Sequence, residues 1–267
     1  MAGILGDAAR TEILPRFRDL AAAGVRQKSS HLDLVTDADV AAEARIAEAL
    51  ANAFPSAVVV GEESASRDPA VLDGLDTAEL AFVIDPVDGT KNFSSGLPLF
   101  GVMAAVLQRG AVVAGIVHDP IVGDCAIGLA GGGAWIEGPD GRQTALHVAA
   151  PRPLADMLGI VSWLFMAEPL RSTVTANLSR VAGAVDYRTA AHEYRLVAAG
   201  HYDFLMFGKL APWDHLAGCL IHREAGWYSA CLDGTPYDVT SRAEGLLCAP
   251  DVASWTLLRD ALIGDGQ

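Results

Sequence analysis

The chain has 267 residues, of which 51% are apolar, so it can bury the core of one large domain or two modest ones. Its 19 lysines and arginines are outnumbered by 33 aspartates and glutamates, which gives a formal net charge of −14 and a pI near 4.7. This balance argues against nucleic-acid polymers and anionic membranes as general partners. An anionic small molecule can still bind where metal ions supply local positive charge.

Neither the cysteines nor the N-terminus indicates export. The cysteines show no C-x-x-C pair and no metal-finger spacing, so we expect small buried residues in a reducing compartment. The N-terminus carries Asp7, Glu12 and Pro15 where a signal peptide needs an uninterrupted apolar run, and the longest nearly apolar run, 157–167, is shorter than the ~18 residues of a membrane helix. We therefore expect a cytoplasmic protein. The four cysteines are Cys125, Cys219, Cys231 and Cys248.

Helical spacing of apolar residues predicts that an amphipathic helix opens the chain, with an irregularity at Pro15. The polar stretch KSSHLDLVTDAD, at 28–39, is predicted to be a loop. From Asp39 the helical pattern resumes, and Pro55 ends it before a β-branched strand at 58–60. This helix therefore delivers the chain into a sheet.

The apolar run at 81–84 predicts a buried strand that carries Asp85 at its C-terminal end, where Pro86 would end the hydrogen-bonded ladder. Two apolar runs within 101–120 follow, and the Arg109-Gly110 pair between them predicts an antiparallel hairpin. The first half is therefore expected to contain antiparallel strands.

The second half alternates strand-sized and helical segments, which indicates α/β layering. Strands are predicted at 158–163 and 202–207, and helices near 168–183, 190–200 and 213–226. A boundary is predicted near 145–155, which divides the chain into an N-terminal α+β domain, 1–148, and a C-terminal α/β domain, 149–267.

Two aspartates lie three residues apart around a proline in VIDPVDGTKNF, at 83–93. A surface turn accounts for Asp-Gly and Pro by themselves. More acidic residues occur at predicted strand ends or helix starts, and each alone is more often a solvated acid or a helix cap. These are Asp39, Glu62, Glu63 and Asp214.

Taken together, the acidic residues indicate a metal site. Carboxylates clustered without basic partners repel one another and raise one another's pKa unless hard cations neutralise them. Glu62, Asp85, Asp88 and Asp214 supply about four negative charges, which suits two or three Mg²⁺ ions. Zinc fits less well, because the seven histidines show no ligand spacing.

With these motifs in this order, the chain resembles the inositol monophosphatase superfamily of Mg²⁺-dependent, lithium-sensitive phosphatases. The resemblance covers nearly the whole chain and implies a layered α-β-α-β-α sandwich of the inositol monophosphatase and fructose-1,6-bisphosphatase type, and a homodimer. The matching segments are KSSHLDLVTDAD at 28–39, GEES at 61–64, DPVDGTKNF at 85–93, GGGAW at 131–135 and PWDHLAGCLIHREAG at 212–226.

The resemblance implies a role for each acidic residue. Glu62, Asp85 and the carbonyl of Val87 would bind one metal, and Asp85, Asp88 and Asp214 a second, so that Asp85 bridges the two. Glu62 would also lie near a weaker third metal and take part in catalysis. Two metals can stabilise the attacking and leaving oxygens of an in-line displacement.

The resemblance also implies which residues contact the attacking water and the phosphate. Thr90, hydrogen-bonded to Asp39, resembles the pair that orients and deprotonates the attacking water. Gly89 would let backbone N–H groups approach the phosphate where Thr90 begins a helix. Glu63 either supports the metal site from behind or is solvated, and the sequence favours neither interpretation.

Two departures from the family pattern concern the substrate. Phe207 stands where members that act on inositol phosphates carry an acid, and Arg188 stands where glycine is expected. Arg188 is either a substrate contact, able to bind a second phosphate or a carboxylate, or an exposed helix-start residue. Inositol monophosphate or a similar polyol phosphate is expected first, then histidinol phosphate, then a 3′(2′),5′-bisphosphate nucleotide.

Two other functions compete with this hypothesis. Haloacid-dehalogenase phosphatases use a nucleophilic aspartate in D-x-D-G-T, but DPVDGT has one residue more between its aspartates, and the chain has no Asp-Asp pair for Mg²⁺. A metal-dependent binding or regulatory module could keep the fold without turnover. The complete set of Asp39, Thr90 and the metal ligands favours an enzyme.

Overall fold

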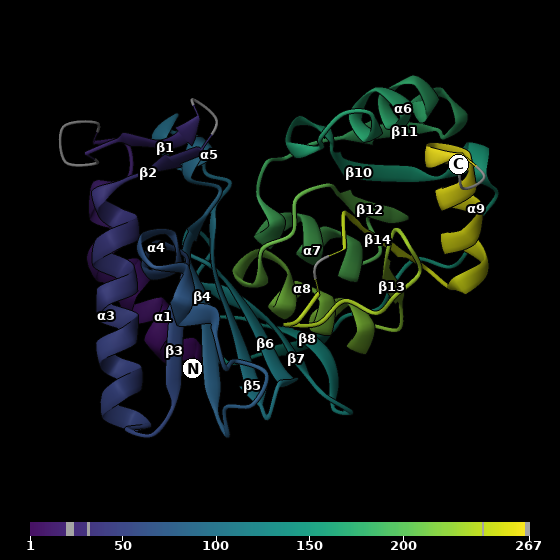
Figure 1. The fold of residues 1–267 in the computed structure, drawn as a ribbon. Helices are drawn as coiled ribbons and strands as arrows, with labels where there is room; N and C mark the ends of the chain where they lie inside the picture. The colour runs from purple at the N-terminus through teal and green to yellow at the C-terminus, as the bar shows by residue number, and fades with distance from the viewer. Residues whose placement is uncertain (20–23, 31–32, 242, 265–267) are drawn as a thin grey trace.

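The computed structural model describes residues 1–19, 24–30, 33–241 and 243–264. They form two mixed β-sheets and three layers of helices, stacked in the order α-β-α-β-α (Figure 1). The layered sandwich predicted from the resemblance is confirmed. Within the described ranges, no helix is long and apolar enough to span a bilayer.

The first sheet has seven strands in the order β3-β4-β5-β6-β7-β8-β9. β3 and β4 are parallel, and all later neighbours are antiparallel. The predicted hairpin is formed by β5 and β6, with Arg109 and Gly110 both at positive φ, as its tight turn requires. The strands are β3 (Val58–Gly61), β4 (Ala81–Asp88), β5 (Gly101–Gln108), β6 (Ala111–Asp119), β7 (Asp124–Leu129), β8 (Gly133–Glu137) and β9 (Gln143–Ala145).

The second sheet has five strands in the order β11-β10-β12-β14-β13. β10 lies parallel to β11 and to β12, whereas β14 is antiparallel to both of its neighbours. Its strands are β10 (Leu158–Ser162), β11 (Gly183–Val185), β12 (Phe204–Phe207), β13 (Tyr228–Cys231) and β14 (Leu246–Ala249).

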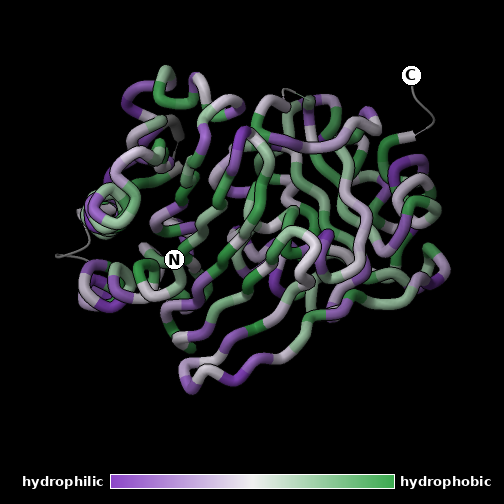
Figure 2. The backbone as a smooth tube through the Cα atoms, turned by 90° about the horizontal axis from the view of Figure 1, so that it is seen from below, coloured by the Kyte–Doolittle hydropathy of each residue, from purple (hydrophilic) through white to green (hydrophobic). Residues whose placement is uncertain are grey.

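The helices bury apolar faces against the sheets in three cores. α1 (Ala2–Ala8) and α3 (Asp37–Ala53) cover the outer face of the first sheet, and α6 (Leu170–Asn177) and α9 (Val252–Ile263) the outer face of the second (Figure 1). α7 (Ala190–Ala198) and α8 (Pro212–Glu224) fill the space between the sheets. Hydrophobic segments run along the interior strands, and many hydrophilic ones lie at the periphery (Figure 2).

The middle core contains side chains from both halves of the chain, such as Val83 and Met103 of the first sheet and Ile160 and Leu205 of the second. The division into domains 1–148 and 149–267 therefore has a shared core at its boundary, and it stays a prediction. The cysteines are free, and only Cys219 is not fully buried.

Helix α8 rests directly on the first sheet because glycines face it. A Cβ atom on Gly115 of β6 would lie 2.4 Å from the carbonyl oxygen of Ala217, and one on Gly128 of β7 would lie 2.8 Å from the Cα of Ile221. Such distances are too short for any side chain, so these positions require glycine. The close packing fixes the helix that carries Asp214 near its N-terminus.

Three local predictions are wrong. The stretch 28–39 is not a loop but contains β1 (Arg26–Ser30), β2 (Asp33–Val35) and the start of α3, whose N-cap is Thr36. Pro86 does not end its strand, because a bulge between Asp85 and Asp88 removes the need for a ladder donor there. The helix predicted at 168–183 ends at 180, where a 3₁₀ turn precedes β11.

Candidate active site

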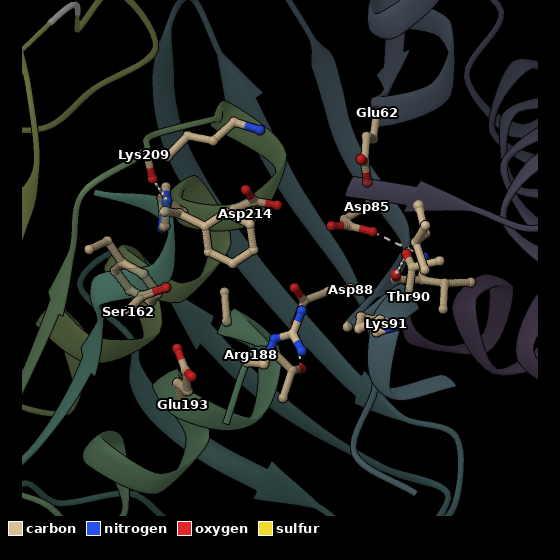
Figure 3. Close-up of a pocket in the computed structure, with 18 residues that line it drawn as sticks. Glu62, Asp85, Asp88, Thr90, Lys91, Ser162, Arg188, Glu193, Lys209 and Asp214 are labelled. Carbon is tan, nitrogen blue, oxygen red and sulfur yellow. Dashed lines mark hydrogen bonds between the residues drawn. The ribbon is translucent and has the colours of Figure 1, made fainter. Parts of the chain in front are cut away.

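A cavity of about 390 Å³ opens between the two sheets, and its wall collects residues from six separate segments (Figure 3). Among the predicted site residues, only Asp39 does not line it directly. The lining includes Glu62 of α4 (Glu62–Arg67), Asp85, Val87 and Asp88 of β4, Gly89, Thr90 and Lys91 at α5 (Thr90–Ser94), Ser162, Arg188 to Ala190, Glu193, Phe207, Lys209 and Asp214.

Asp85, Asp88 and Asp214 converge in this cavity. Each offers a carboxylate oxygen, and these oxygens lie within 4.8 Å of one another. Two come from the bulge of β4, and the third comes from the first turn of α8, which Pro212 begins. The bulge thus aims both aspartates of the DPVD motif toward the helix on the other side of the cavity.

The electrostatics of this cluster suit a divalent cation. Burial, together with the charges of Glu62 and Asp88, raises the pKa of Asp214 to about 8 and that of Asp85 well above its usual range. Burial also raises the pKa of Asp88. Three acidic side chains that are costly to ionise together become stable as carboxylates when a cation neutralises them. An all-oxygen donor set is the kind that Mg²⁺ prefers.

Hydrogen bonds orient the aspartates of this cluster. Thr189 donates its hydroxyl to Oδ2 of Asp88 at 2.6 Å, and the N–H of Ala191 donates to the same oxygen at 2.7 Å. Oδ1 of Asp85 accepts from the N–H of Val87 at 3.0 Å. Asp85 and Asp88 are therefore each held in place through one carboxylate oxygen.

Thr90 and Asp39 form the predicted pair. The Thr90 hydroxyl lies 3.0 Å from Oδ1 of Asp39 and also 3.0 Å from the carbonyl oxygen of Val87. Asp39 is fully buried, and its Oδ2 accepts from both the N–H and the hydroxyl of Thr36. Burial raises the pKa of Asp39 to about 6, so at neutral pH it is mostly a carboxylate that can accept a proton.

Lys28 forms ion pairs with both glutamates of the GEES segment, Glu62 and Glu63. Nζ of Lys28 lies 2.8 Å from Glu62 and 2.6 Å from Glu63. Glu63 is only 6% exposed, which rules out the solvated alternative, and burial raises its pKa to about 7. Glu43 of α3 accepts the backbone N–H groups of Glu63 and Ser64 at 2.7 and 2.8 Å, which fixes the start of α4 and therefore the place of Glu62.

The remaining predicted residues, Gly89, Arg188 and Phe207, also line the cavity. Gly89 adopts a φ of 86°, which glycine tolerates best, and the helix of Thr90 begins directly after it. Arg188 lines the cavity and is not an exposed helix-start residue. Phe207 is buried and packs against the His215 ring, with centroids 4.5 Å apart. Burial lowers the pKa of His215 to about 4, so this ring is neutral.

Sequence reasoning missed the residues that act through other residues. Thr189, Lys28 and Glu43 hold Asp88, Glu62 and α4 through contacts between distant parts of the chain. In the sequence, Thr189 precedes an ordinary helix, and Glu43 lies within an ordinary helical pattern. Of these three residues, Glu43 alone offers a signal. It falls on the apolar face of α3, and a glutamate is rarely buried there without a partner.

Comparisons with known proteins identify the family of the chain. Residues 4–263 match the inositol monophosphatase family. An inositol-1-monophosphatase of Caulobacter vibrioides is 31% identical over 217 residues, which cover 79% of this chain and 81% of the relative. The Nus factor SuhB of Pasteurella multocida is 34% identical over 200 residues, covering 73% of this chain and 70% of the relative.

The fold is shared with solved structures of the same group. The structure of the extragenic suppressor protein suhB from Bartonella henselae superposes with a TM-score of 0.81 at 28% identity, covering 96% of this chain and 94% of that one. The chain belongs to the inositol monophosphatase family, a family of phosphatases.

Proposed function

We propose that the protein is a Mg²⁺-dependent phosphomonoesterase that hydrolyses a small phosphorylated metabolite by direct attack of water. The observation that carries the proposal is the convergence of Asp85, Asp88 and Asp214 in one cavity, with the Thr90–Asp39 pair on its wall. Glu62, Asp85, the carbonyl of Val87, Asp88 and Asp214 would hold two or three Mg²⁺ ions. When bound, Mg²⁺ would polarise the phosphate and lower the pKa of the attacking water.

The chain's own residues move the proton. The Thr90 hydroxyl accepts a proton from water as it gives its own to Asp39, which lies within hydrogen-bonding distance. The Thr36 N–H and hydroxyl hold Asp39 in place from the opposite side. Water oxygen bonds to phosphorus as the ester oxygen leaves, so no covalent phosphoenzyme forms.

For the substrate, we propose inositol monophosphate or a similar polyol phosphate. Family membership supports this choice, and the names of relatives such as the Caulobacter inositol-1-monophosphatase point the same way. Histidinol phosphate and a 3′(2′),5′-bisphosphate nucleotide are the alternatives. Phe207 favours them, because a phenyl ring cannot accept hydrogen bonds from sugar hydroxyls.

The other proposals concern the location of the protein in the cell, its oligomeric state and its partners. We place the protein in the cytoplasm as a lithium-sensitive homodimer, with no nucleic-acid polymer and no membrane as partner. The net charge of −14 supports the last point. A non-enzymatic role as a metal-dependent binding or regulatory module is the second candidate, because relatives include proteins named Nus factor SuhB.

The first experiment is phosphate release from inositol 1-phosphate, histidinol phosphate and 3′-phosphoadenosine 5′-phosphate, each with Mg²⁺, with EDTA and with Mg²⁺ plus Li⁺. We expect release that needs Mg²⁺ and falls with Li⁺. Asp88→Asn is expected to abolish it by weakening metal binding, while the amide oxygen can still accept from Thr189. Full activity and unchanged Mg²⁺ affinity in this variant would contradict the proposal, and metal binding without release from any ester would favour the binding module.

A further inference from the structure

Arg188 lies on the cavity wall in a conformation that its residue type disfavours. Its φ is 59°, in the left-handed region, where a side chain on Cβ is crowded and glycine is not. The turn is held from two sides, because Asp186 accepts the N–H of Arg188 at 2.8 Å and Glu193 accepts the N–H of Tyr187 at 3.0 Å. Strained residues that the surrounding structure holds in place cluster at functional sites.

The charge of Arg188 favours the ionised form of Asp186, but its guanidinium makes no hydrogen bond or ion-pair contact with the described residues. Within the described part of the chain, no ion pair joins it to a carboxylate, although Asp186 lies two residues away and Glu193 lines the same cavity. Its Nε is buried and has no hydrogen-bond acceptor. Figure 3 shows the guanidinium between Lys91 and Glu193, across the cavity from Glu62. A buried N–H of this kind is costly unless a ligand supplies the acceptor.

The rest of the cavity indicates which kind of acceptor fits. The acidic cluster and its cations would engage the phosphate that is cleaved, whereas Phe207 and Phe165 add apolar surface elsewhere in the cavity. A guanidinium presents parallel N–H donors that match a carboxylate or a phosphate at two points. A single neutral hydroxyl does not offer this two-point match.

We infer that the substrate is a phosphomonoester with a second anionic group, a carboxylate or a phosphate, which Arg188 binds through its guanidinium fork. This inference rests on the proposed phosphatase function, and it favours an ester with two anionic groups, such as the bisphosphate nucleotide, over inositol monophosphate and histidinol phosphate, which carry one. Arg188 contributes binding energy to both the ground state and the transition state, so its loss raises KM for such esters more than it lowers kcat.

Two matched pairs of esters test the inference. 3-Phosphoglycerate and glycerol 3-phosphate differ by a carboxylate, and glucose 1,6-bisphosphate and glucose 1-phosphate differ by a phosphate. For the wild type and Arg188→Gly, kcat/KM is measured on all four with Mg²⁺. We expect the preference for the two-anion member to fall by about 10- to 100-fold in Arg188→Gly, mainly through KM, in the pair whose second anion the site accepts.

Three variants distinguish the effect of the Arg188 charge from the effect of the guanidinium shape and from a failure to fold. Arg188→Gly relieves the left-handed strain and should fold. Arg188→Lys keeps the charge but not the fork, and it should recover only part of the preference. Arg142→Ala removes an equal charge from an exposed turn and should change neither pair.

An equal loss on both members of both pairs would place Arg188 on the cleaved phosphate and overturn the inference, as would no loss at all. Calorimetric binding of the same four esters to the wild type and Arg188→Gly gives a second readout. This measurement shows whether Arg188 binds the second anionic group even if no ester is cleaved. Failure of the phosphatase function and failure of this inference are therefore distinguishable.

Discussion

Thr189 donates its hydroxyl to Oδ2 of Asp88 at 2.6 Å, and this bond joins the central helical layer to the bulged end of β4. The N–H of Ala191, in the first turn of α7, donates to the same oxygen. One carboxylate oxygen of Asp88 therefore accepts hydrogen bonds from the start of α7, and the other faces the cavity. A proposed metal ligand on the first sheet is thus oriented by the layer that packs against it.

Thr189→Val should weaken metal binding without removing any proposed ligand. The methyl group keeps the volume, but Asp88 loses the donor that orients it, and changes of this kind typically cost about 10- to 100-fold in metal affinity or activity. Calorimetric titration with Mg²⁺ or Mn²⁺ measures the effect. Thr189→Ser, which keeps the hydroxyl, should bind as the wild type does; equal weakening in both variants would mean that the hydrogen bond is not the cause.

Thr90→Ala should separate turnover from metal binding. The change removes the hydroxyl between water and Asp39 but leaves every proposed carboxylate ligand, so we expect unchanged Mg²⁺ affinity and a fall in kcat of ~10²-fold or more. Thr90→Ser is the matched control and should keep most of the rate. A loss of Mg²⁺ affinity as large as the loss of kcat would show that Thr90 acts on the metal site.

Glu43→Gln should destabilise the protein and weaken the Glu62 side of the site. Two backbone N–H groups of α4 donate to the Glu43 carboxylate, and an amide offers only one acceptor atom for them. We expect the free energy of unfolding to fall by about 1 to 3 kcal/mol, together with a higher Mg²⁺ requirement. Glu48→Gln on the exposed side of α3 is the control in chemical denaturation, and an equal effect there would exclude a role for the Glu43 contacts.

His222 should make the protein less stable in mild acid. Burial holds its pKa well below the usual value, its Nδ1 pairs with Ser229 at 2.8 Å, and its Nε2 has no partner. Below pH ~6.5 the unfolded chain binds a proton that the folded protein does not, so His222 costs about 1.4 kcal/mol of stability per pH unit. Denaturation at pH 7.0 and 5.5 should show a smaller difference for His222→Gln than for the wild type. The same change at the exposed His201 should leave the difference as it is.

The acidic residues of the site could be predicted because their signals are local, whereas the layered arrangement was predicted from the resemblance to the family. Asp85, Asp88 and Thr90 lie within one short motif, and Asp214 follows the proline that begins its helix, so the structure brings together residues whose patterns are already specific. The bulge at Pro86 was not predicted, because a proline after a strand ordinarily ends it, and only pairing with β5 shows that the strand continues.

Supporting contacts could not be read from the sequence. Thr189 and Asp88 are 101 residues apart, and Lys28 and Glu63 are 35 apart, so nothing in the local pattern of either residue points to its partner. The hairpin of β1 and β2 was missed for a related reason. The residues of β1 are all polar, and β2 has only three residues, so this two-stranded ribbon lacks the apolar alternation by which strands are recognised.

The glycines beneath α8 have a consequence for how this protein can diversify. Gly115 and Gly128 admit no side chain, so the helix that carries Asp214 packs directly against the first sheet. Arg188 and Phe207 are part of the wall of the same cavity and are not among its three clustered carboxylates. Substitutions at these two positions can exchange one substrate for another while the hydrolytic chemistry is inherited unchanged, which makes this wall the natural target for redesigning specificity.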